Sequence, residues 1–368
     1  MGRGSLALGF SVACVLVLPG LGRAYTFIDV VNSDGPYDQF TPPSINDSGD
    51  VAFRANLDGG GWAIVTGNGS GTSVVADTSG PYSVFLTEVA INDGGTVVFH
   101  ADRDAGGGTG IYTGPDPATD VVAEEDATFL SVDLFAINTA GTIVFNARLS
   151  DGPRGLYIGT SPVVDNSGTF LYFGIPDIND AGTVAFRATL DSLDYGIYTN
   201  ASTIAEMSGP YAGFGDFVSI NEAGTVAFTA SLDGGGSGLF VGDDPATDTI
   251  ADTSGPYSSF SQPSIDNAGK VTFYAERDGA SSGIFTGPDP VADRVIGGGD
   301  PLFGSTVDSV SFFWKGSNDA GDVAFSYRLA NARYGIGIAA VPEPSHASGS
   351  LAAAALLLWI RALRRRSR

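Results

Sequence analysis

The sequence predicts an all-β fold, a seven-bladed β-propeller of four-stranded antiparallel blades closed by the N-terminal strand. Three observations predict it. A nine-residue motif occurs seven times, four strand-like runs fit into one repeat, and the N-terminal segment has the pattern of a strand that the last repeat lacks. The 368 residues divide into an N-terminal segment (1–24), a repeat body (25–340) and a C-terminal tail (341–368).

The repeated motif is a polar turn followed by an apolar strand. Successive copies start 46, 46, 41, 42, 45 and 52 residues apart. Internal repeats of this period are typical of propellers and solenoids. The seven copies are INDSGDVAF (45–53), INDGGTVVF (91–99), INTAGTIVF (137–145), INDAGTVAF (178–186), INEAGTVAF (220–228), IDNAGKVTF (265–273) and SNDAGDVAF (317–325).

The first half of the motif predicts a tight turn. An asparagine side chain can close an Asx-type turn, and a glycine can take the positive φ needed to leave it. The predicted turn residues are Asn46, Gly49, Asn92, Gly95, Asn138, Gly141, Asn179, Gly182, Asn221, Gly224, Gly269, Asn318 and Gly321.

The second half of the motif predicts a strand that is apolar on both faces. Val184, Phe186, Ala188 and Leu190 alternate on one face, and the opposite face opens with Ala185 or a small or β-branched equivalent. A sheet that is apolar on both faces must be covered on both. Blades stacked against like neighbours meet this requirement.

The spacing favours a propeller over two alternatives. In the second repeat the strand-like runs are 85–92, 96–103, 110–114 and 119–124, with no helical stretch between them. Four short strands in about 45 residues are typical of a propeller blade. A parallel β-helix has a shorter period, and a string of β-sandwiches needs about 100 residues per domain.

The two ends of the body complement each other. The seventh repeat stops after its third strand, at 335–339, whereas residues 26–31 precede the Gly-Pro-Tyr of 35–37. The fourth strands at 73–82 and 249–257 lead into the next repeat through the same Gly-Pro-Tyr. We therefore expect residues 26–31 to complete the seventh blade, leaving no long free edge.

Residues 1–24 are predicted to be a signal peptide. Arg3 precedes an apolar run at 6–18 that is too short to cross a membrane comfortably, and small residues lead to cleavage between Ala24 and Tyr25. A lipoprotein signal is the alternative, because Cys14 lies in this segment. Cys14 is the only cysteine, so the mature chain can form no disulfide and no cysteine-ligated metal site.

The C-terminal tail combines a short motif, an apolar helix and basic residues. Val341, Pro342, Glu343, Pro344 and Ser345 precede a nearly continuous apolar run at 351–360 and five arginines. An apolar helix with a basic end is oriented with that end in the cytoplasm. The tail resembles the PEP-CTERM sorting signal of exopolysaccharide-producing Gram-negative bacteria. The resemblance implies a transient inner-membrane anchor that an exosortase-type protease removes.

The repeats also resemble a known family. They are similar to the NxxGxxAF tandem-repeat proteins, and the likeness extends over essentially the whole body. This resemblance implies a surface protein with an exchangeable C-terminal anchor. It implies no particular chemistry.

Charge excludes two classes of partner. The chain carries 18 basic and 41 acidic residues, and removal of both ends takes away seven arginines and one glutamate, which leaves a body of net charge −29. Such a surface repels nucleic acid and anionic lipid. Cations and neutral polysaccharide remain compatible with it.

Few residues point to catalysis. The body has one histidine, His100, in a variable slot after the repeat phenylalanine, where a surface or inter-blade role is favoured over a catalytic one. The sequence has no nucleophile elbow, Walker loop or HExxH motif. We expect no cofactor and no catalytic residue.

The loops carry aspartates, and carboxylates are preferred ligands of calcium. Calcium binding therefore remains an alternative to a chain without any bound ion. The aspartates also suit local turns, and their spacing is not that of a dedicated calcium loop. The loops carry Asp116 and Asp120, then Asp243, Asp244 and Asp248, then Asp289 and Asp293.

The expected function is that of an exported cell-surface or extracellular-matrix protein, a non-enzymatic binding or structural module with polysaccharide as a possible partner. The alternative is a polysaccharide hydrolase or lyase on a propeller scaffold. Functional residues on repeat proteins arise where the repeat departs from regularity, here at 192–195 and 297–313. Trp314, after the second departure, is either a core residue or an aromatic contact for sugar.

Overall fold

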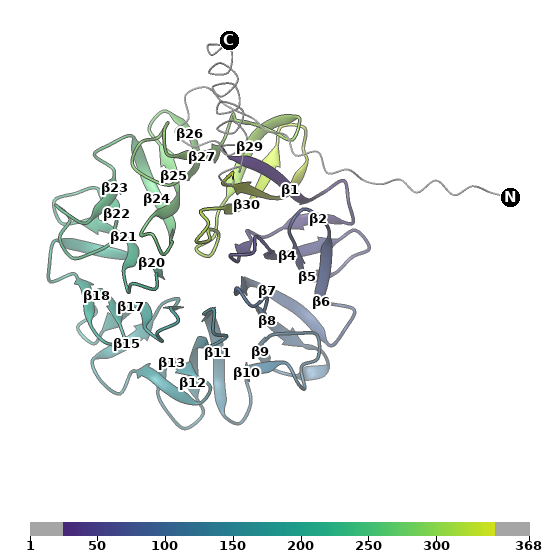
Figure 1. The fold of residues 1–368 in the computed structure, drawn as a ribbon. Helices are drawn as coiled ribbons and strands as arrows, with labels where there is room; N and C mark the ends of the chain where they lie inside the picture. The colour runs from purple at the N-terminus through teal and green to yellow at the C-terminus, as the bar shows by residue number, and fades with distance from the viewer. Residues whose placement is uncertain (1–24, 343–368) are drawn as a thin grey trace, which may run out of the picture.

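The computed structural model describes residues 25–342, which form a ring of seven antiparallel sheets around a central axis (Figure 1). The predicted all-β, seven-bladed propeller is therefore confirmed. The helical content of residues 25–342 is one short 3₁₀ turn, η1 (Asp104–Gly106). No helix in this range is long and apolar enough to cross a membrane. The predicted signal peptide (1–24) and all of the tail beyond Pro342 lie outside the described residues.

Each blade is numbered here after the motif copy that it contains. Blade 1 consists of β2 (Tyr37–Phe40), β3 (Ser44–Ile45), β4 (Val51–Leu57), β5 (Trp62–Gly67) and β6 (Thr72–Asp77). Blade 2 consists of β7 (Tyr82–Ile91), β8 (Val97–Arg103), β9 (Thr109–Tyr112) and β10 (Val121–Glu124). Blade 3 consists of β11 (Phe129–Ile137), β12 (Ile143–Leu149), β13 (Arg154–Ile158) and β14 (Ser161–Asp165).

The remaining blades repeat this order. Blade 4 consists of β15 (Phe170–Phe173), β16 (Asp177–Ile178), β17 (Val184–Leu190), β18 (Tyr195–Thr199) and β19 (Thr203–Glu206). Blade 5 consists of β20 (Tyr211–Ile220), β21 (Val226–Leu232), β22 (Ser237–Phe240) and β23 (Thr249–Asp252). Blade 6 consists of β24 (Tyr257–Ile265), β25 (Val271–Arg277), β26 (Ala280–Phe285) and β27 (Arg294–Gly297). Blade 7 joins β28 (Pro301–Leu302), β29 (Ser305–Ser311), β30 (Val323–Leu329) and β31 (Tyr334–Ala340) to β1 (Thr26–Asn32).

The strands of blade 2 differ from the predicted runs mainly at their ends. The first strand begins at Tyr82 rather than at 85, because Tyr82 pairs with Arg103 beyond a bulge in the ladder. The third ends at Tyr112 and the fourth begins at Val121. A bulge inserts an extra residue into one strand and shifts the pairing register locally, so strand ends beyond a bulge are harder to predict from side-chain alternation.

The core is divided among the seven blade interfaces. Ala52 and Ile64 on one face of blade 1, for example, pack against Tyr82, Phe85 and Phe99 of blade 2. The same arrangement of small residues against aromatic residues recurs at the other interfaces. Each sheet is therefore covered on both faces, as its two-sided apolar pattern requires.

The ring is closed by strands from opposite ends of the body. Strand β1 pairs antiparallel with β31 from Thr26 opposite Ala340 to Asn32 opposite Gly335. The Tyr327 hydroxyl donates to Asp29 at 2.7 Å, and Arg333 forms an ion pair with the same carboxylate. The predicted completion of blade 7 by the N-terminal strand is confirmed.

Each motif turn joins two neighbouring strands of its own blade, as the turn at Asn92 joins β7 to β8. Each motif asparagine accepts the N–H of the residue four positions later, as Asn46 Oδ1 does from Asp50 at 2.9 Å. The turn glycines have φ between 77° and 84°, a region open to glycine at little cost. These glycines are Gly49, Gly95, Gly141, Gly182, Gly224, Gly269 and Gly321.

The asparagine amides extend this turn into a chain of links around the ring. In six repeats Nδ2 donates to the backbone carbonyl of the motif residue in the next blade, at 2.9 to 3.1 Å. Asn318 closes the chain onto Asn46, 272 residues away. The sixth repeat has Asp266 in this position, and its carboxylate cannot donate such a bond.

We expect a chain that begins at Asp34 to melt far below the intact body or to aggregate. Removing β1 exposes the edge of β31 and uncovers the apolar cluster that contains Val30 and packs against Ile28 and Val31. Burial of one such side chain contributes about 1.5–3 kcal/mol, against a typical total stability of roughly 5–15 kcal/mol. Thermal melting and size-exclusion chromatography measure the effect, and a chain ending at Pro342 is the control. Equal stability and a monomeric state in the Asp34 chain would contradict closure.

A second prediction concerns the missing link at blade 6. Asp266→Asn supplies the absent donor, so we expect it to raise the free energy of unfolding by about 1 kcal/mol. The reciprocal change Asn179→Asp removes a buried link, and we expect it to lower stability by about 1–3 kcal/mol. Urea denaturation measures both. If Asp266→Asn lowers stability as much as Asn179→Asp does, the hydrogen bond from the motif amide to the next blade does not stabilise the ring.

Candidate functional site

A segment of blade 7 crosses the centre of the ring. Residues 312–317, between β29 and β30, bring the Lys315 carbonyl within 3.0 Å of the backbone N–H of Ile45 in blade 1. Trp314 is 2% exposed and packs in the cluster between blades 3 and 4, with Ala136 and Phe173. The buried interpretation of Trp314 therefore holds, and its ring is not available as a sugar contact.

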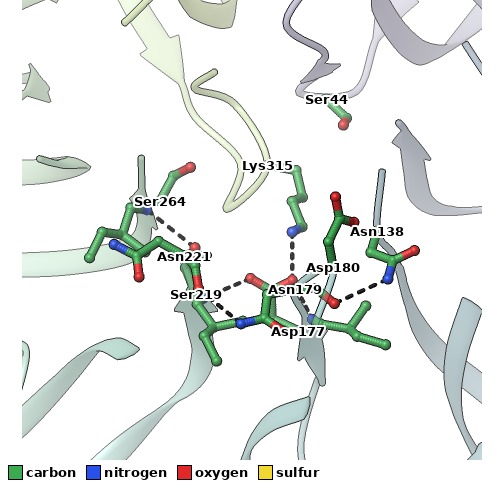
Figure 2. Close-up of polar contacts among 12 residues, drawn as sticks. Ser44, Asn138, Asp177, Asn179, Asp180, Ser219, Asn221, Ser264 and Lys315 are labelled. Carbon is green, nitrogen blue, oxygen red and sulfur yellow. Dashed lines mark hydrogen bonds and ion pairs between the residues drawn. The ribbon is translucent and has the colours of Figure 1, made fainter. Parts of the chain in front are cut away.

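The crossing segment carries a lysine that pairs with a buried carboxylate. Lys315 Nζ lies 2.5 Å from Asp177 Oδ1, and the Asp177 side chain is fully buried (Figure 2). Asp177 also accepts the N–H groups of Ile178 at 2.8 Å and of Ile220, in blade 5, at 2.9 Å. The Asp177 carboxylate thus joins blades 4, 5 and 7.

Other blades use serine at the position of Asp177. Ser44 Oγ accepts the N–H of Ile91 in blade 2, and Ser219 Oγ accepts the N–H of Ile265 in blade 6, each at 3.2 Å. These bonds match the one that Asp177 makes to Ile220. Asp177 is therefore a charged substitute for a neutral inter-blade link, and Lys315 balances that charge.

A pocket of about 440 Å³ lies where blades 6, 7 and 1 meet. Its walls combine aromatic rings with neutral polar groups. The lining residues are Thr41, Pro42, Ser261, Gln262, Tyr274, Val310, Ser311, Phe312 and Phe313. Pockets of 300–1,000 Å³ with apolar walls and a few polar groups are typical of small-ligand sites.

Gln262 is the unusual residue of this pocket. It lies in the bulged part of β24, and its φ of 29° is outside the regions that residues with a side chain normally adopt. Its Oε1 atom is buried and has no hydrogen-bond partner in the structure. A strained backbone and an unpaired buried acceptor occur together at the wall of the pocket.

Tyr274 reaches the pocket from the variable slot that follows the motif phenylalanine. In blades 1 to 4 the residue in this slot reaches the next blade. Arg54 Nη1 donates to the Phe85 carbonyl at 2.5 Å, Asn146 Nδ2 donates to the Phe173 carbonyl at 2.9 Å, and Arg187 forms an ion pair with Asp216 at 2.6 Å. The slot therefore belongs to the blade interfaces.

His100 occupies the same slot in blade 2. Its side chain is 4% exposed, and Nδ1 lies 4.0 Å from Asp133 of blade 3. Burial lowers the pKa of His100, which favours the neutral imidazole. The structure places His100 between two blades, in agreement with the inter-blade interpretation.

The loop aspartates bond to their own loops. The backbone N–H groups of Asp116, Asp244 and Asp289 donate to the carboxylates of Asp120, Asp248 and Asp293 at 2.9 to 3.2 Å. Within residues 25–342, no group of three or more histidine, cysteine or acidic side chains is placed to hold a metal ion.

The predicted processing sites lie at the borders of the ring. Tyr25 is buried in the cluster between blades 6 and 7, directly before β1. The Val341 N–H donates to Asp322 Oδ1 at 2.7 Å, and Pro342 is the last described residue. Ala24, Glu343, Pro344 and Ser345 lie outside the described residues.

The ion pair at the centre leads to a further prediction. Lys315→Met leaves the Asp177 carboxylate buried without its cation, so we expect it to lower the free energy of unfolding by about 3 kcal/mol. Adding Asp177→Ser restores the neutral link that blades 1 and 5 use, and we expect it to recover most of that loss. Chemical denaturation of both single variants and the double variant measures the coupling. Additive losses in the double variant would contradict it.

Structural comparison finds distant propellers. Prolyl oligopeptidase B from Galerina marginata is 10% identical, with a TM-score of 0.49, and the match covers 84% of this chain and 50% of that one. This chain thus spans half the length of that protein. The Dos1 propeller is 8% identical, with a TM-score of 0.46 and coverage of 86% and 96%. Because these likenesses are weak, the propeller assignment here rests on the observed sheet order.

Sequence comparison identifies a family. A search of curated proteins finds no match. A family model described as a family of unknown function (DUF7453) matches residues 157–348, just over half of the chain. The matched range begins in blade 3 and includes the crossing segment and the last strand of the ring. The chain belongs to this family of unknown function (DUF7453).

Proposed function

We propose that this protein is exported, sorted by an exosortase-type protease, and displayed at the cell surface or in the extracellular matrix. Its propeller serves there as a non-enzymatic binding or structural module, with extracellular polysaccharide as the partner. The two sequence ends carry this proposal, through the signal-like residues 1–24 and the tail that resembles a PEP-CTERM signal.

The borders of the fold support this proposal. Strand β1 begins at Thr26, immediately after the proposed cleavage between Ala24 and Tyr25, and β31 ends at Ala340, just before the Val341–Ser345 motif. Cleavage at either place leaves the pairing of β1 with β31 intact. A processed chain therefore retains every blade.

The composition of the body also supports it. A net charge of −29 over 25–340 favours solubility and excludes nucleic acid as a partner. The one histidine of the body, His100, is buried at a blade interface, where it cannot reach a substrate. These features suit a binding or structural role better than hydrolysis.

Intact-mass measurement of the protein extracted from the cell surface tests the proposal. We expect Tyr25 at the N-terminus and a C-terminus between Pro342 and Gly349. We also expect the purified species to release no reducing ends from the polysaccharide of the producing cells.

Replacement of Pro342 and Pro344 by alanine is the matched variant, and we expect it to retain the tail. A stable surface species that keeps Arg364–Arg368 would refute sorting by cleavage. Release of reducing ends by the processed protein would instead refute the non-enzymatic role.

A further inference from the structure

We propose that the pocket between blades 6, 7 and 1 binds a neutral sugar unit of a polysaccharide. Tyr274 and Phe313 contact the apolar C–H face of the sugar, and Gln262 Oε1 accepts a hydrogen bond from one of its hydroxyl groups. This inference rests on the proposed function, and it adds the site and the ligand class.

The aromatic wall suits one face of a sugar. Tyr274 and Phe313 are both half-buried and line the pocket, and Phe312, which also lines it, is buried. Aromatic rings offer large rigid apolar surfaces, and tyrosine adds a polar tip. A sugar ring presents C–H groups on its face and hydroxyls at its edge, so it can use both kinds of surface.

Gln262 supports ligand binding in this pocket independently of the aromatic residues. A buried acceptor without a partner carries a desolvation penalty of about 1–3 kcal/mol, and Oε1 is such an atom. A ligand hydroxyl donating to Oε1 offsets that penalty. Backbone strain concentrates at functional sites, and Gln262, which lines the pocket, has a φ of 29°.

The charge of the site selects a neutral ligand. The pocket lining contains no lysine, arginine, histidine, aspartate or glutamate. The strongly acidic chain repels uronate-rich or sulfated polymers, and a pocket lined without carboxylates offers a cation little. A neutral, hydroxyl-rich molecule satisfies the polar groups that are present.

In blade 6 the variable slot holds Tyr274, which packs partly against the apolar cluster shared with blade 7 and makes no polar bridge within residues 25–342. Arg54, His100, Asn146 and Arg187 fill the corresponding space in blades 1 to 4 by reaching the next blade. Tyr274 also borders the 440 Å³ pocket.

Calorimetric titration of the full chain in mild detergent tests the proposal. The probes are maltohexaose, cellohexaose, laminarihexaose and mannohexaose, with hexagalacturonate as the anionic control. We expect at least one neutral probe to bind, and its affinity to fall about tenfold, which is about 1.4 kcal/mol, in Tyr274→Ala and in Gln262→Leu.

Tyr172→Ala is the matched control, because Tyr172 is 53% exposed on blade 4, away from the pocket. We expect it to bind as the unaltered chain does. Thermal melting identifies any variant that fails to fold, and Gln262→Leu then remains as the milder test of the acceptor.

Three results would overturn the proposal. Neutral-probe binding that neither pocket variant weakens would place the glycan elsewhere and leave the proposed function standing. Tighter binding of hexagalacturonate than of every neutral probe would overturn the ligand class. Binding of no probe at millimolar concentration would overturn the pocket assignment, while export and processing are judged separately by the intact mass.

Discussion

Each blade of this protein has two apolar faces, and this constraint governs the rest of the architecture. A sheet with Phe53 on one face and Ala52 on the other must be covered twice. In an open row the two outer blades would each leave one face in water. A ring removes both exposed faces by packing blade 7 against blade 1. The pairing of β1 with β31 brings Val30 into the cluster between these two blades.

Much of this fold could be predicted because its determinants are local. Turn glycines such as Gly182 and the apolar alternation after Val184 can be recognised within ten residues of sequence. The match of 26–31 to other fourth strands predicted the closure of the ring. The amide links between asparagines were missed, because the same side chain also explains a local turn. A polar group with one evident partner gives no sign in the sequence that it has a second in the next blade.

The candidate site was harder to predict for a related reason. Lys315 and Asp177 are 138 residues apart, and their contact depends on a segment that crosses the ring. The sequence did carry one signal, an acidic residue where other repeats have serine, alanine or glycine at the equivalent position. The pocket gave a weaker signal, since Tyr274 occupies a slot that varies from repeat to repeat. Irregularity in a repeat marks where to look, but the cavity itself depends on three-dimensional packing.

The position of β31 has a mechanical consequence. This strand ends at Ala340 and is hydrogen-bonded on both sides, to β30 and to β1. A pull applied at Val341 acts along β31, so the ladder bonds on both flanks are loaded together and in parallel with one another. They must yield as a group by sliding, whereas a strand pulled from a free edge can peel away one bond at a time. A force applied at Val341 therefore acts on two ladders of backbone hydrogen bonds at once.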